Sequence, residues 1–172
     1  MQTIKTENII LRKIHESDAF MMYEYAKNPI VGQMAGWDAH KSIEETKSII
    51  KVLELLKTYS IVYDNKMVGT IGYEIIDKRI ILGYALSQEY WGKNIMHRSL
   101  KALFVYLFNK LDINVIEAST YLDNTKSQNV LLKLGFKKIG EKEKIINNKN
   151  AKVYEFNLTK EDYERMINSG NK

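Results

Sequence analysis

The segment from residue 80 to residue 111 constrains the fold more than any other part of the chain. It begins as a strand-like run, turns at residues 88–94 around Gly92, and continues as a strongly amphipathic helix. The first N–H groups of a helix have no partner within the helix and lie at the positive end of its dipole. A strand that enters such a helix through a glycine turn therefore predicts an anion site, suited to a phosphate, at the turn.

The rest of the chain is predicted to alternate between strands and helices. Strands are expected at residues 7–14, 60–63, 67–76, 79–86, 115–121, 136–145 and 151–158. Helices are expected over residues 18–27, after a capping box at Ser42 and Glu45, before Leu111, after Asn124 and after Thr159, whereas residues 28–41, with Pro29, read as irregular. Short turns predict antiparallel neighbours, but the helix that links strands 79–86 and 115–121 predicts a parallel pair. The fold class is therefore α/β, with a mixed, mostly antiparallel sheet of about seven strands and helices on both faces.

Composition narrows the classes of protein that fit. The chain has 172 residues, 45% of them apolar, which is enough for the core of a single domain over residues 1–172. It contains no cysteine, so it has no disulfide framework and no thiolate metal site, and no run approaches the roughly 20 apolar residues of a membrane span. We expect a cytoplasmic protein. The net charge of +5 comes mostly from scattered lysines, which favours a solvated surface and an anionic cofactor over a nucleic-acid site.

A second set of residues gives the first segment a context. The chain continues with Asn124-Thr125-Lys126-Ser127, an apolar helix, and then Leu134-Gly135-Phe136. The order of these features resembles the acetyl-CoA-binding core of the GNAT superfamily of N-acetyltransferases. The order is a strand, the Trp91-Gly92-Lys93 turn, a helix, a strand, Asn-x-x-Ser, a helix and Leu-Gly-Phe. The resemblance is strongest to the branch that acetylates the N-terminal alanine or serine of ribosomal proteins. It implies acetyl-CoA as cosubstrate, no metal, and a splay between the fourth and fifth strands.

The turn departs from the family pattern at two positions. Members usually carry Arg or Gln, then Gly, then Gly or Ala where this chain has Glu89, Gly92 and Asn94. Glu89 has the wrong sign for a phosphate neighbour, although backbone groups do the binding. Asn94 accepts a left-handed backbone better than most residues, but its side chain narrows the site.

The resemblance implies a set of cofactor-binding residues. Pantetheine would lie in the splay as a pseudo-strand against the backbone of the fourth strand, and the pyrophosphate would lie at the helix start. The set is Tyr84, Leu86, Ser87, Trp91, Gly92, Lys93, Asn94, Ile95, Met96, Arg98, Asn124 and Ser127, with His97 and Lys101 as further candidates for the 3′-phosphate. The alternatives are structural: Gly92 could end a loop, Trp91 could fill the core, and Asn124 and Ser127 could simply cap a helix.

Acetyl transfer by direct attack of an amine on the thioester requires stabilisation of charge at two atoms. We expect the Leu86 N–H to serve the oxyanion and Ser127 to supply a proton to the thiolate, because Leu131 stands where many family members carry a tyrosine. The base is left open among Glu74, Glu117 and His40, with Glu74 as the catalytic candidate. Trp37, His40 and Glu117 are candidates for acceptor binding, with the alternative that the two glutamates lie in water and that His40 packs on Trp37.

The energy of deprotonation favours one class of acceptor. At pH 7.4, removing a proton from a lysine amine of pKa about 10.4 costs roughly 4 kcal/mol, but an α-amine near 7.8 costs only about 0.5. We therefore expect an N-terminal α-amine of a protein or peptide, with a ribosomal protein as one candidate. Small amines (a polyamine, an aminoglycoside or an amino acid), a silent acyl-CoA sensor and a lysine-based RNA-binding module are the alternatives. Monomer and homodimer both stay open.

Overall fold

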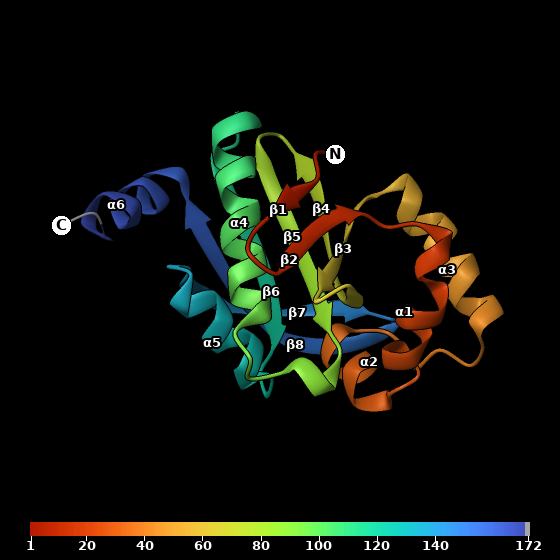
Figure 1. Cartoon of the computed structure of the whole chain (residues 1–172). Coiled ribbons are helices and arrows are strands. Elements are labelled where there is room, and N and C mark those ends of the chain that lie inside the picture. The colour runs from red at the N-terminus through yellow and green to blue at the C-terminus, as the bar shows by residue number, and fades with distance from the viewer. Residues whose placement is uncertain (171–172) are drawn as a thin grey trace.

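The computed structural model of the chain describes residues 1–170, which form one eight-stranded sheet and six α-helices (Figure 1). The strands are β1 (Ile4–Lys5), β2 (Ile9–Lys13), β3 (Lys57–Tyr63), β4 (Lys66–Ile76), β5 (Arg79–Leu86), β6 (Val115–Tyr121), β7 (Lys137–Ile146) and β8 (Lys149–Thr159). The helices are α1 (Ala19–Ala26), α2 (Pro29–Ala35), α3 (Ile43–Leu55), α4 (Ile95–Lys110), α5 (Thr125–Lys133) and α6 (Lys160–Gly170). Within these residues no helix is both long and apolar enough to cross a membrane.

The sheet has the order β1-β2-β3-β4-β5-β6-β8-β7, and only β5 and β6 pair in parallel. This confirms the predicted mixed, mostly antiparallel sheet. It also confirms that the two strands joined by the long helix pair in parallel. The additional strand is β1, a two-residue ladder that pairs Ile4 with Leu11 of β2. Because β1 has only two residues, it is too short to show the alternating pattern that predicts a strand.

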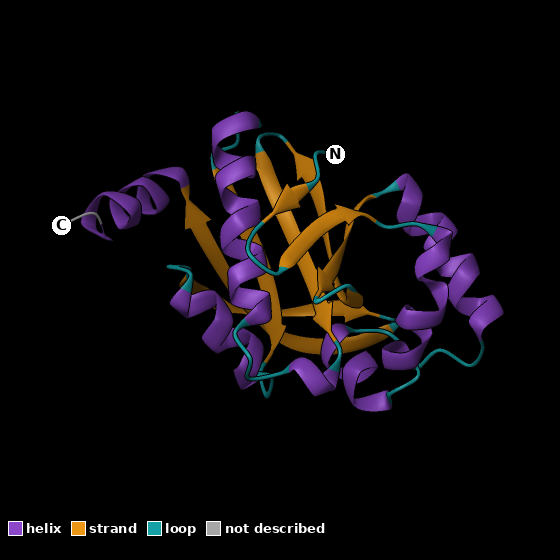
Figure 2. Ribbon diagram, viewed as in Figure 1, coloured by secondary structure: helices purple, strands orange, loops and turns teal. Residues whose placement is uncertain are grey.

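Two clusters of buried side chains lie on opposite sides of the sheet. The larger cluster joins α4 and α5 to the strands, and the smaller one joins α1, α2 and α3 to Ile14 and Met67. Figure 2 shows the two groups of helices separated by the strands. The predicted stripe on α4 is confirmed, because Leu100, Leu103 and Leu107 are completely buried.

Helix α2 corrects the prediction that residues 28–41 are irregular. Its seven residues are too few for a recognisable apolar period, but its ends carry clear signals. The Asn28 side chain accepts a hydrogen bond from the N–H of Ile30 (3.0 Å), and Pro29 occupies the first helical position, where its missing N–H costs nothing. Gly36 ends the helix with a left-handed backbone, at φ 86°.

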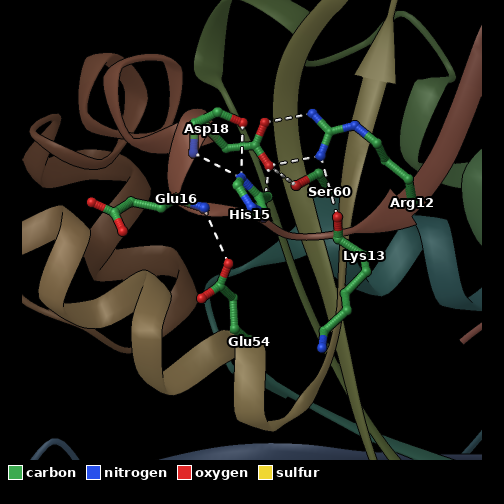
Figure 3. Close-up of polar contacts among 8 residues, drawn as sticks. Arg12, Lys13, His15, Glu16, Asp18, Glu54 and Ser60 are labelled. Atoms are coloured by element: carbon green, nitrogen blue, oxygen red, sulfur yellow. Dashed lines mark hydrogen bonds and ion pairs between the residues drawn. The ribbon is translucent and has the colours of Figure 1, made fainter.

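A buried carboxylate fixes the start of α1 to the sheet (Figure 3). Asp18 is 4% exposed and accepts hydrogen bonds from Arg12 of β2 (2.8 Å), from the hydroxyl of Ser60 in β3 (2.8 Å) and from the backbone N–H of His15 (3.1 Å). Burial by itself would raise the pKa of Asp18, but these hydrogen bonds outweigh burial and hold its pKa below the ordinary value. The carboxylate is therefore charged, and fully paired, in the folded protein.

Replacing this carboxylate tests its contribution to stability. We expect Asp18→Asn to lower the free energy of unfolding at pH 7 by about 2 kcal/mol, because a neutral amide, with one acceptor oxygen and an NH2 group that can only donate, then faces the three donors and leaves the Arg12 guanidinium without its counter-charge. A depressed folded-state pKa stabilises the protein above the unfolded pKa, so the difference from the wild type should shrink as the pH falls below about 4. Urea unfolding between pH 3 and pH 7 measures both effects.

The control variant is Glu24→Gln. Glu24 forms an exposed ion pair with Lys27 on α1, and its loss should change stability by less than about 0.5 kcal/mol. Equal stability of Asp18→Asn and the wild type at pH 7 would show that the buried network contributes nothing.

Candidate functional site

A cavity of about 750 Å³ opens where β5 and β6 separate. The two strands pair from Arg79 with Val115 to Leu82 with Ala118, and beyond that point β6 pairs only with β8, as far as Tyr121 with Val153. The walls of the cavity come from the end of β5, the turn after it, the first turns of α4 and α5, the end of β6 and the C-terminal half of α2. The separation predicted between the fourth and fifth strands of the sequence is this cavity.

One wall of the cavity is the backbone edge of β5. The Ser87 N–H donates to the carbonyl of Val68 in β4 (2.8 Å). In an antiparallel pair only every second residue bonds to a given neighbour, so the residues on either side of each bonded residue face away from β4. The backbone groups of Leu86 and Tyr84 therefore point the other way, beyond the last residue paired with β6. The Leu86 carbonyl accepts the indole N–H of Trp91 (2.8 Å). The Leu86 N–H and both backbone groups of Tyr84 remain directed at the cavity.

A helix start forms the second wall. Gly92 and Asn94 both have left-handed backbones, at φ 75° and φ 61°, and α4 begins directly after them. The Asn94 side chain does not cap α4, and the first helical residues, Ile95, Met96 and His97, line the cavity. A Cβ built on Gly92 would meet no atom within 4 Å, so the space in front of the turn is open. Backbone N–H groups, helix dipole and open space together suit an anion.

The start of α5 faces this helix across the cavity. The Asn124 side chain accepts from the backbone N–H of Ser127 (3.1 Å) and donates to the carbonyl of Met34 in α2 (3.3 Å). The Ser127 hydroxyl lies 2.7 Å from the hydroxyl of Tyr84. Asn124 and Ser127 thus both cap the helix and line the cavity, so the two interpretations of this motif are compatible.

Cationic side chains border the same space. The Lys126 ammonium lies 4.5 Å from the ring centroid of Trp91, so it spans the cavity from α5 to the turn before α4. Lys133 also lines the cavity. His97 lines it too, but burial lowers its pKa and disfavours its charged form, so the positive charge comes from Lys126 and Lys133. These charges suit the several phosphates of a nucleotide.

Most of the predicted cofactor residues meet at this cavity. Those that line it are Tyr84, Leu86, Trp91, Gly92, Asn94, Ile95, Met96, Asn124 and Ser127. Three do not: Ser87 is bonded to Val68, the Lys93 ammonium lies over the ring of Tyr90, and Arg98 donates to the side chain of Asn8. Their side chains belong to the surroundings of the site.

The predicted base and acceptor residues lie elsewhere. His40 is buried beside α3, its ring 2.9 Å from the hydroxyl of Thr46, and burial lowers its pKa. The Trp37 ring packs near it, with 6.3 Å between centroids. Glu74 is exposed on β4, and Glu117 pairs with Arg79 at 3.6 Å, both level with the paired part of β5. None of these four residues lines the cavity.

Sequence reasoning missed the residues at the far end of the cavity. Tyr121 and Asp123 come from the end of β6, Met34 from α2 and Ile146 from the end of β7. Among residues 1–170, Asp123 is the only carboxylate that lines the cavity. Burial, together with the charge of Asp123, raises the pKa of Tyr121. Within the same residues no group of three acidic or histidine side chains is placed to hold a metal ion.

Comparison with known proteins gives a consistent result. Residues 8–137 match the acetyltransferase (GNAT) domain family. An uncharacterized N-acetyltransferase, p20, of Bacillus licheniformis is 30% identical over an alignment of 179 positions, which covers 95% of this chain and 99% of that protein. The ribosomal protein uS5 alanine N-acetyltransferase of Escherichia coli is 24% identical over an alignment of 161 positions, which covers 80% of this chain and 79% of that enzyme.

A solved structure adds the fold. RimL, described as a ribosomal L7/L12 alpha-N-protein acetyltransferase and solved in complex with coenzyme A, superposes with a TM-score of 0.81. The superposition covers 92% of this chain and 98% of that one at 24% identity.

Gly36, at the end of α2, lies close to Ile146 at the end of β7 in the cavity wall, and this contact gives a prediction. A Cβ on Gly36 would lie 2.8 Å from a methyl carbon of Ile146 and 3.2 Å from the hydroxyl of Tyr121, on a backbone at φ 86°. We expect Gly36→Ala to lower the free energy of unfolding by at least about 1 kcal/mol, from left-handed strain alone.

Thermal and urea unfolding measure this change against Gly140→Ala. Gly140 lies on β7 with no atom within 4 Å of a Cβ, so its substitution should stay within about 0.5 kcal/mol of the wild type. Equal effects of the two substitutions would contradict the contact.

Proposed function

The chain belongs to the GNAT acetyltransferase family, and from this membership we propose that it transfers the acetyl group of acetyl-CoA to the N-terminal α-amine of a protein or peptide. One observation carries the proposal: the cavity between β5 and β6 joins an unpaired backbone edge to the start of a helix. An extended, amide-containing arm that ends in phosphates fits both features at once.

The residues at the cavity fit such a cofactor. The backbone groups of Tyr84 and Leu86 would pair with the amides of the pantetheine arm, as a neighbouring strand would. The first N–H groups of α4, beside the open space at Gly92, would hold the pyrophosphate, and Lys126 would add positive charge. Acetyl-CoA supplies the activated acetyl group as a thioester.

The same wall offers groups for the chemistry. The acceptor nitrogen forms a C–N bond to the acetyl carbon while the C–S bond breaks, and the electron pair of that bond goes to sulfur. The Leu86 N–H would donate to the acetyl oxygen as negative charge develops there. The Ser127 hydroxyl would donate to the sulfur, which finally takes up one proton, while the acceptor amine loses one to water.

The cavity supports an acceptor that is easily deprotonated. No histidine lies at its acceptor end among residues 1–170, and Asp123 is the only carboxylate that lines it. A carboxylate holds an ammonium group well but is a weak base for a lysine, whose deprotonation at pH 7.4 costs roughly 4 kcal/mol against about 0.5 for an α-amine. The names of two similar proteins, a ribosomal protein uS5 alanine N-acetyltransferase and a ribosomal L7/L12 alpha-N-protein acetyltransferase, support the same class of acceptor.

An acceptor panel tests this proposal. Free thiol released from acetyl-CoA is measured with peptides that have free N-termini, with matching peptides blocked at the N-terminus but containing lysine, and with small amines such as polyamines. We expect kcat/KM for free N-termini to exceed that for blocked lysine peptides at least about tenfold, and to rise with pH up to about 8, as an α-amine deprotonates.

The other outcomes are equally clear. Strong turnover of a small amine with none for the peptides would reverse the acceptor class but keep acetyl transfer. Binding of acetyl-CoA with no thiol release for any amine would point to a silent acyl-CoA sensor.

The phosphate site gives a separate prediction. Gly92→Val places a branched side chain in the open space before α4 and strains a left-handed backbone. We expect the Kd for coenzyme A, measured by calorimetry, to rise at least about tenfold, which is about 1.4 kcal/mol. Gly140→Val, on β7 outside the cavity, is the matched control. Unchanged affinity of Gly92→Val would remove the helix start from the cofactor site.

A further inference from the structure

We propose that the Tyr84 hydroxyl is a positioning group for Ser127: it donates to the Ser127 oxygen and so turns the serine O–H into the cavity, towards the sulfur of the leaving thiol. The inference rests on the proposed function, because it assumes that Ser127 serves that sulfur. It assigns a second, separate role to Tyr84, whose backbone forms the cofactor wall.

The two hydroxyls are brought together from opposite sides of the cavity. Tyr84 lies on β5 and Ser127 on the first turn of α5, 43 positions later, and their oxygens are 2.7 Å apart. The Tyr84 ring packs against the larger hydrophobic cluster, which fixes its direction. The Ser127 backbone is fixed independently by the side chain of Asn124. The contact is therefore set by two rigid elements and does not depend on a flexible loop.

The chemistry of the pair sets the direction of the bond. A phenol O–H is a better hydrogen-bond donor than an aliphatic hydroxyl, because the aromatic ring withdraws electron density from the oxygen. The Tyr84 hydroxyl also lies 3.4 Å from the backbone carbonyl of Ser127, but the Ser127 hydroxyl oxygen, at 2.7 Å, is the nearer acceptor. With Tyr84 donating to that oxygen, the proton of the Ser127 hydroxyl needs another partner. Within residues 1–170 the Ser127 hydroxyl makes no other hydrogen bond, and Ser127 lines the cavity. The free O–H therefore points to the place where the ligand would lie.

Burial keeps the donor protonated. It raises the pKa of Tyr84 to about 12, and the hydrogen bond with Ser127 opposes only part of this change. Tyr84 thus stays neutral over the whole working range of pH. A neutral phenol that donates to a hydroxyl also polarises it, which strengthens the bond that the hydroxyl donates next. The pair compensates for the weak acidity of a serine hydroxyl. Leu131, which is fully buried on the same helix, has no polar atom to contribute.

The test is a set of variants that separates a positioning role from a merely structural one. Tyr84→Phe removes one oxygen and keeps the ring. We expect it to lower kcat about tenfold, with the KM for acetyl-CoA within about twofold of the wild type, while Ser127→Ala lowers kcat about a hundredfold. Because Tyr84 acts through Ser127, the double variant Tyr84→Phe/Ser127→Ala should be no slower than Ser127→Ala alone.

Ser127→Thr provides the second background. Threonine keeps a hydroxyl that can accept from Tyr84. Adding Tyr84→Phe to Ser127→Thr should therefore still lower kcat, whereas adding it to Ser127→Ala should have no effect. The control is Tyr59→Phe, which removes a tyrosine hydroxyl that donates to the Gln2 carbonyl (3.0 Å) away from the cavity. Its kcat should equal that of the wild type. Thermal unfolding of each variant verifies the fold.

The outcomes distinguish the inference from the proposed function. Any amine that gives thiol release serves the assay, so the acceptor class is not at stake. Full activity of Ser127→Ala would remove the role given to Ser127 in the proposed function. An impaired Ser127→Ala beside a fully active Tyr84→Phe would overturn only the inference. An equal loss from Tyr84→Phe in the alanine and threonine backgrounds would also overturn it, because the tyrosine would then act on the fold.

Discussion

The site depends on the point at which β5 and β6 stop pairing. Four residue pairs, ending with Leu82 and Ala118, hold the strands together; past them, β5 keeps only β4 as a partner and β6 keeps only β8. A sheet interior normally satisfies every backbone group, so an interrupted ladder leaves donors and acceptors that need a ligand. The helices that follow the two strands, α4 and α5, begin at the same opening. The candidate site is therefore a property of the backbone more than of particular side chains.

That dependence on backbone explains what could be read from the sequence. Gly92 and Asn94 mark left-handed positions, and such positions are visible in a sequence because few residues tolerate them. The stripe on α4 and the cap at Asn124 are equally local signals. They predicted the strand, turn and helix correctly, along with the parallel pair. Helix α2 was missed because seven residues carry almost no periodicity, although its Asn-Pro start was a usable signal.

The end of the cavity that is lined by Tyr121 and Ile146 could not be predicted in the same way. Tyr121 and Ile146 are neighbours only because the β6–β8–β7 ladders run in a particular register, and nothing near either residue encodes that register. His40 has the chemistry of a base, but it is buried against Thr46 of α3 and does not line the cavity. The Tyr84–Ser127 contact is also tertiary. The sequence pointed to Tyr84 through its backbone and to Ser127 through its hydroxyl. It did not indicate that the two side chains form a pair.

Asn124 links the two ends of the molecule's binding region through one amide. Its oxygen accepts from the first turn of α5, where we propose the donor binds, while its nitrogen donates to the last turn of α2, at the proposed acceptor end. If α2 moves outward to admit a bulky acceptor, it must give up the bond from that nitrogen, and the amide becomes free to reorient. Thermodynamic reciprocity then requires that occupancy on one side alter affinity on the other. Under the proposed function, a single amide would in this way couple the binding of donor and acceptor.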